Sequence, residues 1–270
     1  MPYNQKFTSV TPSQKTEEST LQPEAANHIK ELTTRIIWCL TALIFTSISS
    51  FYWIEEWIAL LSEPLRGVPG WSGYFIFTDI GEAFALRIYL SLRLGLLLTL
   101  PIVLFHSWLF LRPGLFKWES RRLGSILLLS GLSGLVGVLF GYFFLLPSAW
   151  SFFLGFQSQD IAGAGLDLHL ESRIGTYLQL TVSLLLGLGI GFQVPLLFPI
   201  AVWLGLMPAS ELAKRRRFFV ITAFILAAII SPPDVPSQLI IAGILMFIFE
   251  FGIFLILIVE SYGERITKSD

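Results

Sequence analysis

The stretch LGSILLLSGLSGLVGVLFGYFFLLPSAWSFFL, residues 123–154, decides the class of this protein. It contains no charged residue, and about 20 consecutive apolar residues are enough for a helix to cross the hydrocarbon core of a bilayer. The composition of the whole chain agrees with this. Hydrophobic residues make up 54% of it and charged residues 14%, whereas soluble domains have about 45–50% and about 25%. The sequence therefore predicts a membrane protein.

Five further apolar stretches lie on either side of this one, at residues 36–53, 80–111, 174–206, 218–230 and 238–259. Together they predict an all-α membrane protein with six transmembrane helices. The fifth stretch is short, because at about 1.5 Å per residue it reaches only roughly 20 Å. Three explanations stay open: the bilayer thins locally, the fifth and sixth helices form a short hairpin shielded by their neighbours, or Pro232-Pro233 ends a helix inside a protein-lined cleft.

Basic residues are concentrated on one side of the predicted membrane. Those in the loops after the second and fourth spans are Arg112, Lys117, Arg121, Arg122, Lys214, Arg215, Arg216 and Arg217. The loops of the opposite side contain only Arg66 and Arg173. Because basic loops stay on the side from which insertion proceeds, both termini are expected on the inner side, cytoplasm or matrix. The net charge of −1 gives no reason to expect a nucleic-acid partner.

The two ends of the chain are more polar than its centre. Residues 1–27 contain no arginine and no apolar core, so they predict a disordered polar arm and neither a secretory signal nor a transit peptide. Residues 28–260 form the predicted membrane domain. Residues 261–270 form a polar tail.

Two ionisable residues fall deep within the predicted spans. Arg93 and Glu250 lie at similar depths when helical rise is counted from the outer ends of their spans. A charge at such a depth is costly unless it is paired, so we expect the two to form an ion pair or to share a wet cavity. Such a pair would either fix helix packing or act in a proton-linked role.

Small and polar residues mark the packing surfaces of the third and fourth spans. Gly131, Gly134, Gly137 and Gly141 have the spacing that lets helix backbones approach closely. Gln193 lies beside a proline of the fourth span. An intramembrane glutamine either bonds neighbouring helices or receives the helix of a partner.

The sequence lacks the signatures of an enzyme. It contains no HExxH, G-x-S-x-G or Walker motif. The single cysteine, Cys39, and the three histidines offer no metal-ligand spacing. We expect no catalytic residue, no metal and no cofactor.

Two carboxylates lie among basic residues on the predicted inner face. Glu31 is followed one helical turn later by Arg35, and Glu119 lies between Lys117 and Arg121. Local ion pairs are the simplest interpretation of both sites.

Several motifs nevertheless resemble those of a known family. The run HIKELTTR, residues 28–35, is similar to the His-Leu-x-Glu-Leu-Arg-x-Arg signature of TatC, the multi-spanning subunit of the twin-arginine protein translocase. Further similar motifs follow in order at 61–65 (LSEPL), 77–79 (FTD), 108–115 (WLFLRPGL) with Glu119, 191–195 (GFQVP), 231–235 (SPPDV) and 249–250 (FE). The resemblance covers about residues 28–260.

The resemblance implies a receptor that binds export signals carrying two adjacent arginines. Glu31 and Glu119 would accept forked hydrogen bonds from the guanidinium groups, and Phe110 and Pro113 would shape the inner loop. The residues implied at the partner surfaces are Gln193 and Pro195 at a groove, Asp234 at the hairpin of the last two spans, and Pro64 at the outer cap. The implied partners are signal peptides, TatA/TatB-like single-span proteins, further copies of the chain, and membrane lipid. Transport would use the proton gradient.

One departure from the family pattern concerns charge. Thr33 stands where the family has arginine, which removes one positive charge from the motif. Either the electrostatics of the docking face are changed, or the arginine has a structural role that another group takes over. Two alternatives stay open: a proton-coupled transporter that uses Arg93 and Glu250, and a structural relative without receptor activity. The Trp-rich segment at residues 51–57 resembles mitochondrially encoded members. It favours the mitochondrial inner membrane over a bacterial plasma membrane or a thylakoid.

Overall fold

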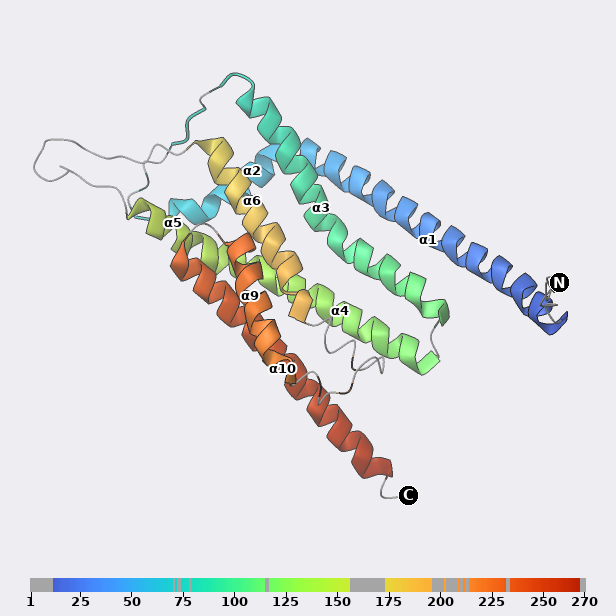
Figure 1. The fold of residues 1–270 in the computed structure, drawn as a ribbon. Helices are drawn as coiled ribbons and strands as arrows, with labels where there is room; N and C mark the ends of the chain where they lie inside the picture. Colours follow the sequence, from blue (N-terminus) through green and yellow to red (C-terminus); the bar gives the residue numbers. More distant parts are fainter. Residues whose placement is uncertain are drawn as a thin grey trace, which may run out of the picture.

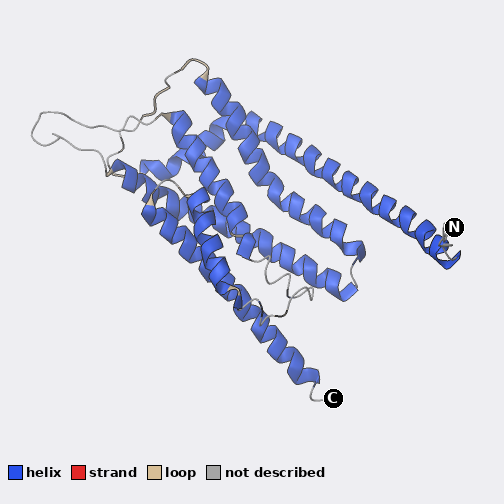
Figure 2. Ribbon diagram, in the orientation of Figure 1, coloured by secondary structure: helices blue, strands red, loops and turns tan. Residues whose placement is uncertain are grey.

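The computed structural model describes residues 12–69, 71, 74–77, 79–114, 117–155, 173–195, 202, 208, 211, 214–231 and 234–267. For residues 12–27, 117–119, 121–122 and 255–267 it describes the backbone alone. This part of the chain contains helices and no named strand (Figure 2). The predicted class of all-α membrane protein is confirmed.

The helices of the described part follow one another along the chain in the order given next. They are α1 (Pro12–Tyr52), α2 (Ile54–Arg66), α3 (Glu82–Leu111), η1 (Arg112–Gly114), α4 (Lys117–Phe140), η2 (Gly141–Leu145), α5 (Leu146–Leu154), α6 (Ile174–Gly191), α9 (Arg216–Ile230) and α10 (Val235–Thr267). In the bundle α1 lies at one edge beside α3, and α9 and α10 lie side by side at the other (Figure 1). The start of α1, the α3–α4 connection and the end of α10 point toward the same end of the bundle. We call this the basic end, because Arg112 and Arg216 lie there.

Five segments of the described helices are long and apolar enough to cross a membrane. They are His28–Tyr52, Glu82–Gly114, Leu123–Leu154, Ile174–Gly191 and Val235–Phe254. Helix α9 has 15 residues and reaches about 22 Å at 1.5 Å per residue, so the fifth helix is short as predicted. The predicted fourth span continues to residue 206, but α6 ends at Gly191. Residues 196–201 and 203–207 lie outside the described part.

Helices α1 and α3 pack through small residues. A Cβ atom on Gly95 would overlap Ser47 Oγ and would lie 2.7 Å from Ser47 Cα. The Thr46 hydroxyl lies 3.0 Å from the Gly95 carbonyl oxygen and 2.8 Å from the Thr99 hydroxyl. Lipid is as apolar as the helices, so close van der Waals contact and hydrogen bonds hold this pair together.

Helices α4 and α6 pack by the same device, as the glycine spacing predicts. A Cβ atom on Gly134 would lie 2.7 Å from the Gly189 carbonyl oxygen, and one on Gly137 would lie 2.7 Å from the Leu188 carbonyl oxygen. Beyond these glycines the helix continues as a π-helical segment, η2, and then as α5. Pro147 follows within the first turn of α5. A π segment is one of the few causes of a bend in a long helix.

Helix α2 lies across the end of the bundle opposite the basic end (Figure 1). Its residues Leu61 and Leu65 are buried in the main hydrophobic core. Pro64 has no N–H to donate to the Leu60 carbonyl one turn earlier, and the Tyr142 hydroxyl donates to that oxygen instead, at 2.8 Å. Tyr177 donates to the neighbouring Leu61 carbonyl at 2.7 Å. Two tyrosines from the spanning helices therefore fix α2 in place.

The predicted boundaries of the polar ends differ from those of the helices. Helix α1 begins at Pro12 and includes most of the arm that the sequence predicts to be disordered. Pro at the first helical turn and the Glu, Gln and Ala residues after it favour a helix. Helix α10 continues to Thr267, beyond the predicted boundary at residue 260.

Candidate functional site

The basic end of the bundle brings together the starts and ends of three helices. The imidazole of His28 on α1 stacks on the ring of Phe110 at the end of α3, with ring centroids 4.6 Å apart and an interplanar angle of 26°. This contact places Phe110 beside His28, the first residue of α1 whose side chain is described. Glu31 lies three residues after His28 and so faces the same side of that helix.

The Glu31 carboxylate has one described partner. Arg35 Nη2 lies 3.1 Å from Glu31 Oε1, and the two side chains are 28% and 32% exposed. The local ion pair predicted for Glu31 is therefore present. A carboxylate accepts several hydrogen bonds, so this pair leaves acceptor capacity for a further cation.

Thr33 stands where the family pattern has arginine, but its side chain does not take over the contacts of a charged residue. Its hydroxyl donates to the Ile29 carbonyl of the same helix at 2.9 Å, and the residue is exposed. The hydroxyl is satisfied within α1. The change therefore removes a positive charge from the surface around Glu31 and adds no new contact between helices.

The α3–α4 connection forms a second part of this surface. Pro113 is exposed in the short helix η1, and the Arg112 guanidinium lies over the Trp108 ring, 5.5 Å from its centroid. The indole Nε1 of Trp108 donates to the Ser120 carbonyl at 3.1 Å, which ties the end of α3 to the first turn of α4. Glu119 precedes Ser120 in that turn, at the same end of the bundle as Glu31. The position of its side chain is outside the described part.

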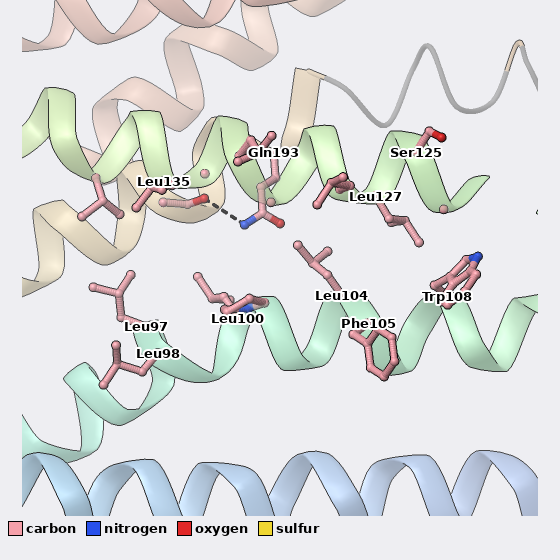
Figure 3. Close-up of a pocket in the computed structure, with 18 of the residues that line it drawn as sticks. Leu97, Leu98, Leu100, Leu104, Phe105, Trp108, Ser125, Leu127, Leu135 and Gln193 are labelled. Atoms are coloured by element: carbon pink, nitrogen blue, oxygen red, sulfur yellow. Dashed lines mark hydrogen bonds between the residues drawn. The ribbon is translucent and has the colours of Figure 1, made fainter. Parts of the chain in front are cut away.

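A pocket of about 870 Å³ lies between α3, α4 and the end of α6. Its α3 wall consists of residues from Leu97 to Trp108, and Trp57 of α2 also contacts it. Two of its described lining residues carry a side-chain amide or hydroxyl, namely Gln193 and Ser125. In Figure 3 its amide projects into the gap between α4 and α3, where Nε2 donates to the Gly189 carbonyl at 3.0 Å. We call this pocket the groove.

The other residues predicted for partner surfaces are not in the lining of the groove. Pro195 is buried just after Gln193. Pro64 is half-buried in α2. Asp234 is buried at the start of α10, where Oδ2 accepts the backbone N–H of Ser237 at 2.7 Å and so caps the helix. The structure therefore brings only Gln193 of these four to the groove.

The structure does not pair Arg93 with Glu250, contrary to the prediction. Glu250 Oε2 lies 2.9 Å from Arg216 Nη2, at the start of α9. Arg93 Nη1 donates to the Ser183 hydroxyl at 3.2 Å, and its guanidinium lies 4.9 Å from the centroid of the Tyr89 ring. The predicted pair is replaced by two separate sites.

The reason is that their helices pack at different places in the bundle: α3 packs on α1, α4 and α6, whereas α10 packs on α9 at the other edge (Figure 1). Glu250 is level with Arg216, which belongs to the basic run at the start of α9. Arg93 lies near the outer end of α1, because its neighbour Gly95 packs against Ser47 and Arg87 forms a salt bridge with Glu55, beyond Tyr52. Counting depth from residue 80 misplaces Arg93, since α3 extends well past the end of α1.

Sequence reasoning also missed the role of α2 and of Trp57. Ile54, Ile58, Leu61 and Leu65 recur at positions i, i+4, i+7 and i+11. This spacing is typical of an amphipathic helix. The same pattern on residues 54–66 would have predicted α2 and its orientation toward the core.

Comparison with known proteins identifies the family. A family model for the Sec-independent protein translocase protein (TatC) matches residues 27–243. The chain belongs to the TatC family. It is 37% identical over 241 residues to the tatC-like protein ymf16 of Reclinomonas americana, a match that covers 88% of each chain. It is 32% identical over 235 residues to the Sec-independent protein translocase protein TatC of Rickettsia prowazekii, covering 87% of this chain and 92% of that one.

The fold agrees with that of a TatC crystal structure. The crystal structure of a twin arginine translocase receptor, TatC, superposes with a TM-score of 0.71 at 30% sequence identity, over 84% of this chain and 98% of that chain. The family predicted from the motifs is confirmed. This TatC-family chain is an integral membrane protein that crosses the membrane several times.

Proposed function

We propose that this TatC-family chain is the receptor and core subunit of a twin-arginine translocase and not an enzyme. It binds a signal peptide with two adjacent arginines at the basic end, on the inner side of the membrane. It then assembles with TatA/TatB-like single-span proteins and further copies of itself to export folded proteins, using the proton gradient. Support comes from the matches to relatives of that name.

The observation that carries this proposal is the surface around Glu31. A half-buried carboxylate lies on the same helix face as a histidine that stacks on Phe110. Arginine is the ligand that such a site favours, because its planar guanidinium forms two parallel hydrogen bonds to a carboxylate and stacks on aromatic rings. Glu119, Phe110 and Pro113 complete the proposed signal site.

A binding experiment tests the signal site. The purified protein in nanodiscs is titrated with an Arg-Arg signal peptide and with its Lys-Lys counterpart. Lysine cannot form the forked pair, so we expect the Arg-Arg peptide to bind at least about tenfold more tightly, in line with about 1.5–3 kcal/mol for a charge-assisted hydrogen bond. Glu31→Gln and Glu119→Gln should each reduce that preference.

The matched control is Glu63→Gln. Glu63 forms a local ion pair with Arg66, 3.1 Å apart, at the opposite end of the bundle. Its loss should leave both peptides unaffected. Equal binding of the two peptides by the unmodified protein, or equal effects of Glu31→Gln and Glu63→Gln, would refute the proposed site.

We further propose that the groove receives the membrane helix of a single-span partner, with Gln193 as its polar contact. Pro195, Asp234 and Pro64 belong to the wider partner surface in this proposal. Gly131→Leu fills the groove, since a Cβ atom there would meet only Leu104 Cδ1 at 3.4 Å. We expect it to abolish cross-linking of a TatA-like helix to residue 104. Gly243→Leu, where no atom lies within 4 Å, should leave cross-linking unchanged.

The alternative of a proton-coupled transporter loses the ion pair on which it depended, because Arg93 and Glu250 lie apart. The mitochondrial inner membrane stays the proposed compartment, on the Trp-rich segment at residues 51–57.

A further inference from the structure

Arg93 differs from the other described arginines at the end opposite the basic end. Arg66, Arg87 and Arg173 each form a salt bridge, with Glu63, Glu55 and Glu82 respectively. Arg93 has no carboxylate within salt-bridge distance among the described residues, only the Ser183 hydroxyl and the Tyr89 ring. A guanidinium carries five N–H donors, and its charge within a membrane is costly without an anion. The Arg93 guanidinium therefore has N–H donors left for an anion from outside the described residues.

The depth of Arg93 indicates which anion is available. It lies between the level of the Arg87–Glu55 salt bridge, beyond the end of α1, and the level of the Gly95–Ser47 contact. It is thus about one helical turn inside the apolar part of α1. Long side chains at that depth extend toward the interface, where lipid phosphates are the abundant anions.

Arg93 also stands directly above the groove. Leu97, Leu100 and Leu104, which line it, follow Arg93 at i+4, i+7 and i+11 and so share its helix face. The α3 wall from Leu97 to Trp108 is about 16 Å long at 1.5 Å per residue. This is close to the depth of one leaflet, half of a core of about 30 Å. A cationic group thus lies at the outer end of an apolar groove that is about as long as one acyl chain and that continues to Trp108 near the basic end.

We propose that, in the absence of a partner helix, the groove holds an acyl chain of one anionic phospholipid whose phosphate is bound by Arg93. Charge complementarity selects the head group, and the almost wholly apolar lining selects the chain. The length of the groove, about half the thickness of the hydrocarbon core, fits one acyl chain. A partner helix that enters the groove displaces this lipid. The proposal goes beyond signal recognition and does not depend on it.

Lipid binding to the purified, delipidated protein tests this proposal, with no signal peptide or partner present. Phosphatidylglycerol is added in detergent and bound lipids are counted by native mass spectrometry. We expect one tightly held lipid on the unmodified chain, and an affinity reduced at least about tenfold in Arg93→Gln. Arg93→Lys keeps the charge and should retain more lipid than Arg93→Gln.

Two further variants separate the groove from the surface charge. Arg87→Gln removes a cation at the same end of the bundle, one whose charge is already paired with the Glu55 carboxylate. This variant should bind lipid as the unmodified chain does. Gly131→Leu fills the groove and should release the lipid although Arg93 is intact. Inorganic phosphate should not compete, because it has no acyl chain.

Equal lipid retention by the unmodified chain and Arg93→Gln would overturn the proposal, as would equal losses in Arg87→Gln and Arg93→Gln. Lipid retention by Gly131→Leu would overturn the placement of the chain in the groove. Glu31→Gln should bind lipid normally, so failure of the signal site and failure of the lipid site give different results. Helicity measured by circular dichroism shows that each variant is folded.

Discussion

Glu31 shows how one residue can serve two partners. In the structure its Oε1 is bonded by Arg35 of the next turn, while the proposed signal site requires the same carboxylate to accept an arginine from a peptide. Arg35 Nε is buried and has no described hydrogen-bond partner. The guanidinium is therefore held incompletely, and an incoming arginine competes with it for Glu31.

The competition predicts a gain from removing Arg35. An i,i+4 ion pair of partly exposed side chains is worth about 0.3–1 kcal/mol, so Arg35→Gln should tighten Arg-Arg peptide binding about two- to fivefold. Isothermal titration of the protein in nanodiscs would measure this. The gain should vanish in the Glu31→Gln background. If it persists there, Arg35 acts on binding by another route.

Close contacts between elements depend on glycines in α3 and α4. The α1–α3 contact is so tight at Gly95 that a single added methyl group meets both the side chain and the backbone of Ser47. The α9–α10 hairpin is held differently, by stacking of Phe219 on Phe249 with centroids 3.8 Å apart and by the Arg216–Glu250 pair. The two kinds of contact predict different effects of mutation on the stability of the fold.

Gly95→Ala should separate α1 from α3. Overpacking of a close contact costs about 1–3 kcal/mol, and backbone atoms of Ser47 cannot rotate away. Thermal unfolding in detergent should show a clearly lower midpoint, whereas Gly243→Ala, which meets no atom within 4 Å, should leave it nearly unchanged. Similar midpoints for the two variants would show that the α1–α3 contact relaxes freely.

The Arg216–Glu250 pair predicts rescue by exchange of the charges. Both side chains are about half exposed, so each of Arg216→Glu and Glu250→Arg should destabilise the fold by only about 0.5–1 kcal/mol. The double exchange should recover most of that loss in a double-mutant cycle. The matched cycle of Arg93→Glu with Glu250→Arg should show no coupling. Coupling in the second cycle but not in the first would contradict the structure.

The whole molecule has two ends of different character. The His28–Phe110 contact, Arg112 and Arg216 lie at the basic end, and α2 with its glutamates covers the other. Helix α9 extends only about 22 Å between them. Helix α10 beside it has 33 residues, so α9 alone is short on this side of the bundle.

Labelling with a membrane-impermeant maleimide tests this orientation. In a Cys39→Ser background, Pro113→Cys should react only from the inner side, and Arg66→Cys only from the outer side. Both positions are exposed, so access to them depends on sidedness alone. Labelling of both positions from one side would contradict the proposed location of the signal site on the inner side.

Much of the fold follows from local properties of the sequence. The length of each apolar stretch fixes how far a helix reaches, so the all-α class and the short fifth helix could be predicted. The glycine spacing of α4 predicted its close contact with α6, because residues three and four apart share a helix face. The Glu31–Arg35 pair was predictable for the same reason.

Relative position along the membrane normal could not be predicted in this way. The partner of Glu250, the level of Arg93 and the residues around Gln193 depend on how far each helix is shifted against its neighbours. That shift is set by contacts between distant residues, such as Gly95 with Ser47 and Tyr177 with the Leu61 carbonyl. The sequence determined which helices form and which ends are basic. Only the tertiary structure decided which charges meet, because packing contacts and not apolar length set the axial offset between helices.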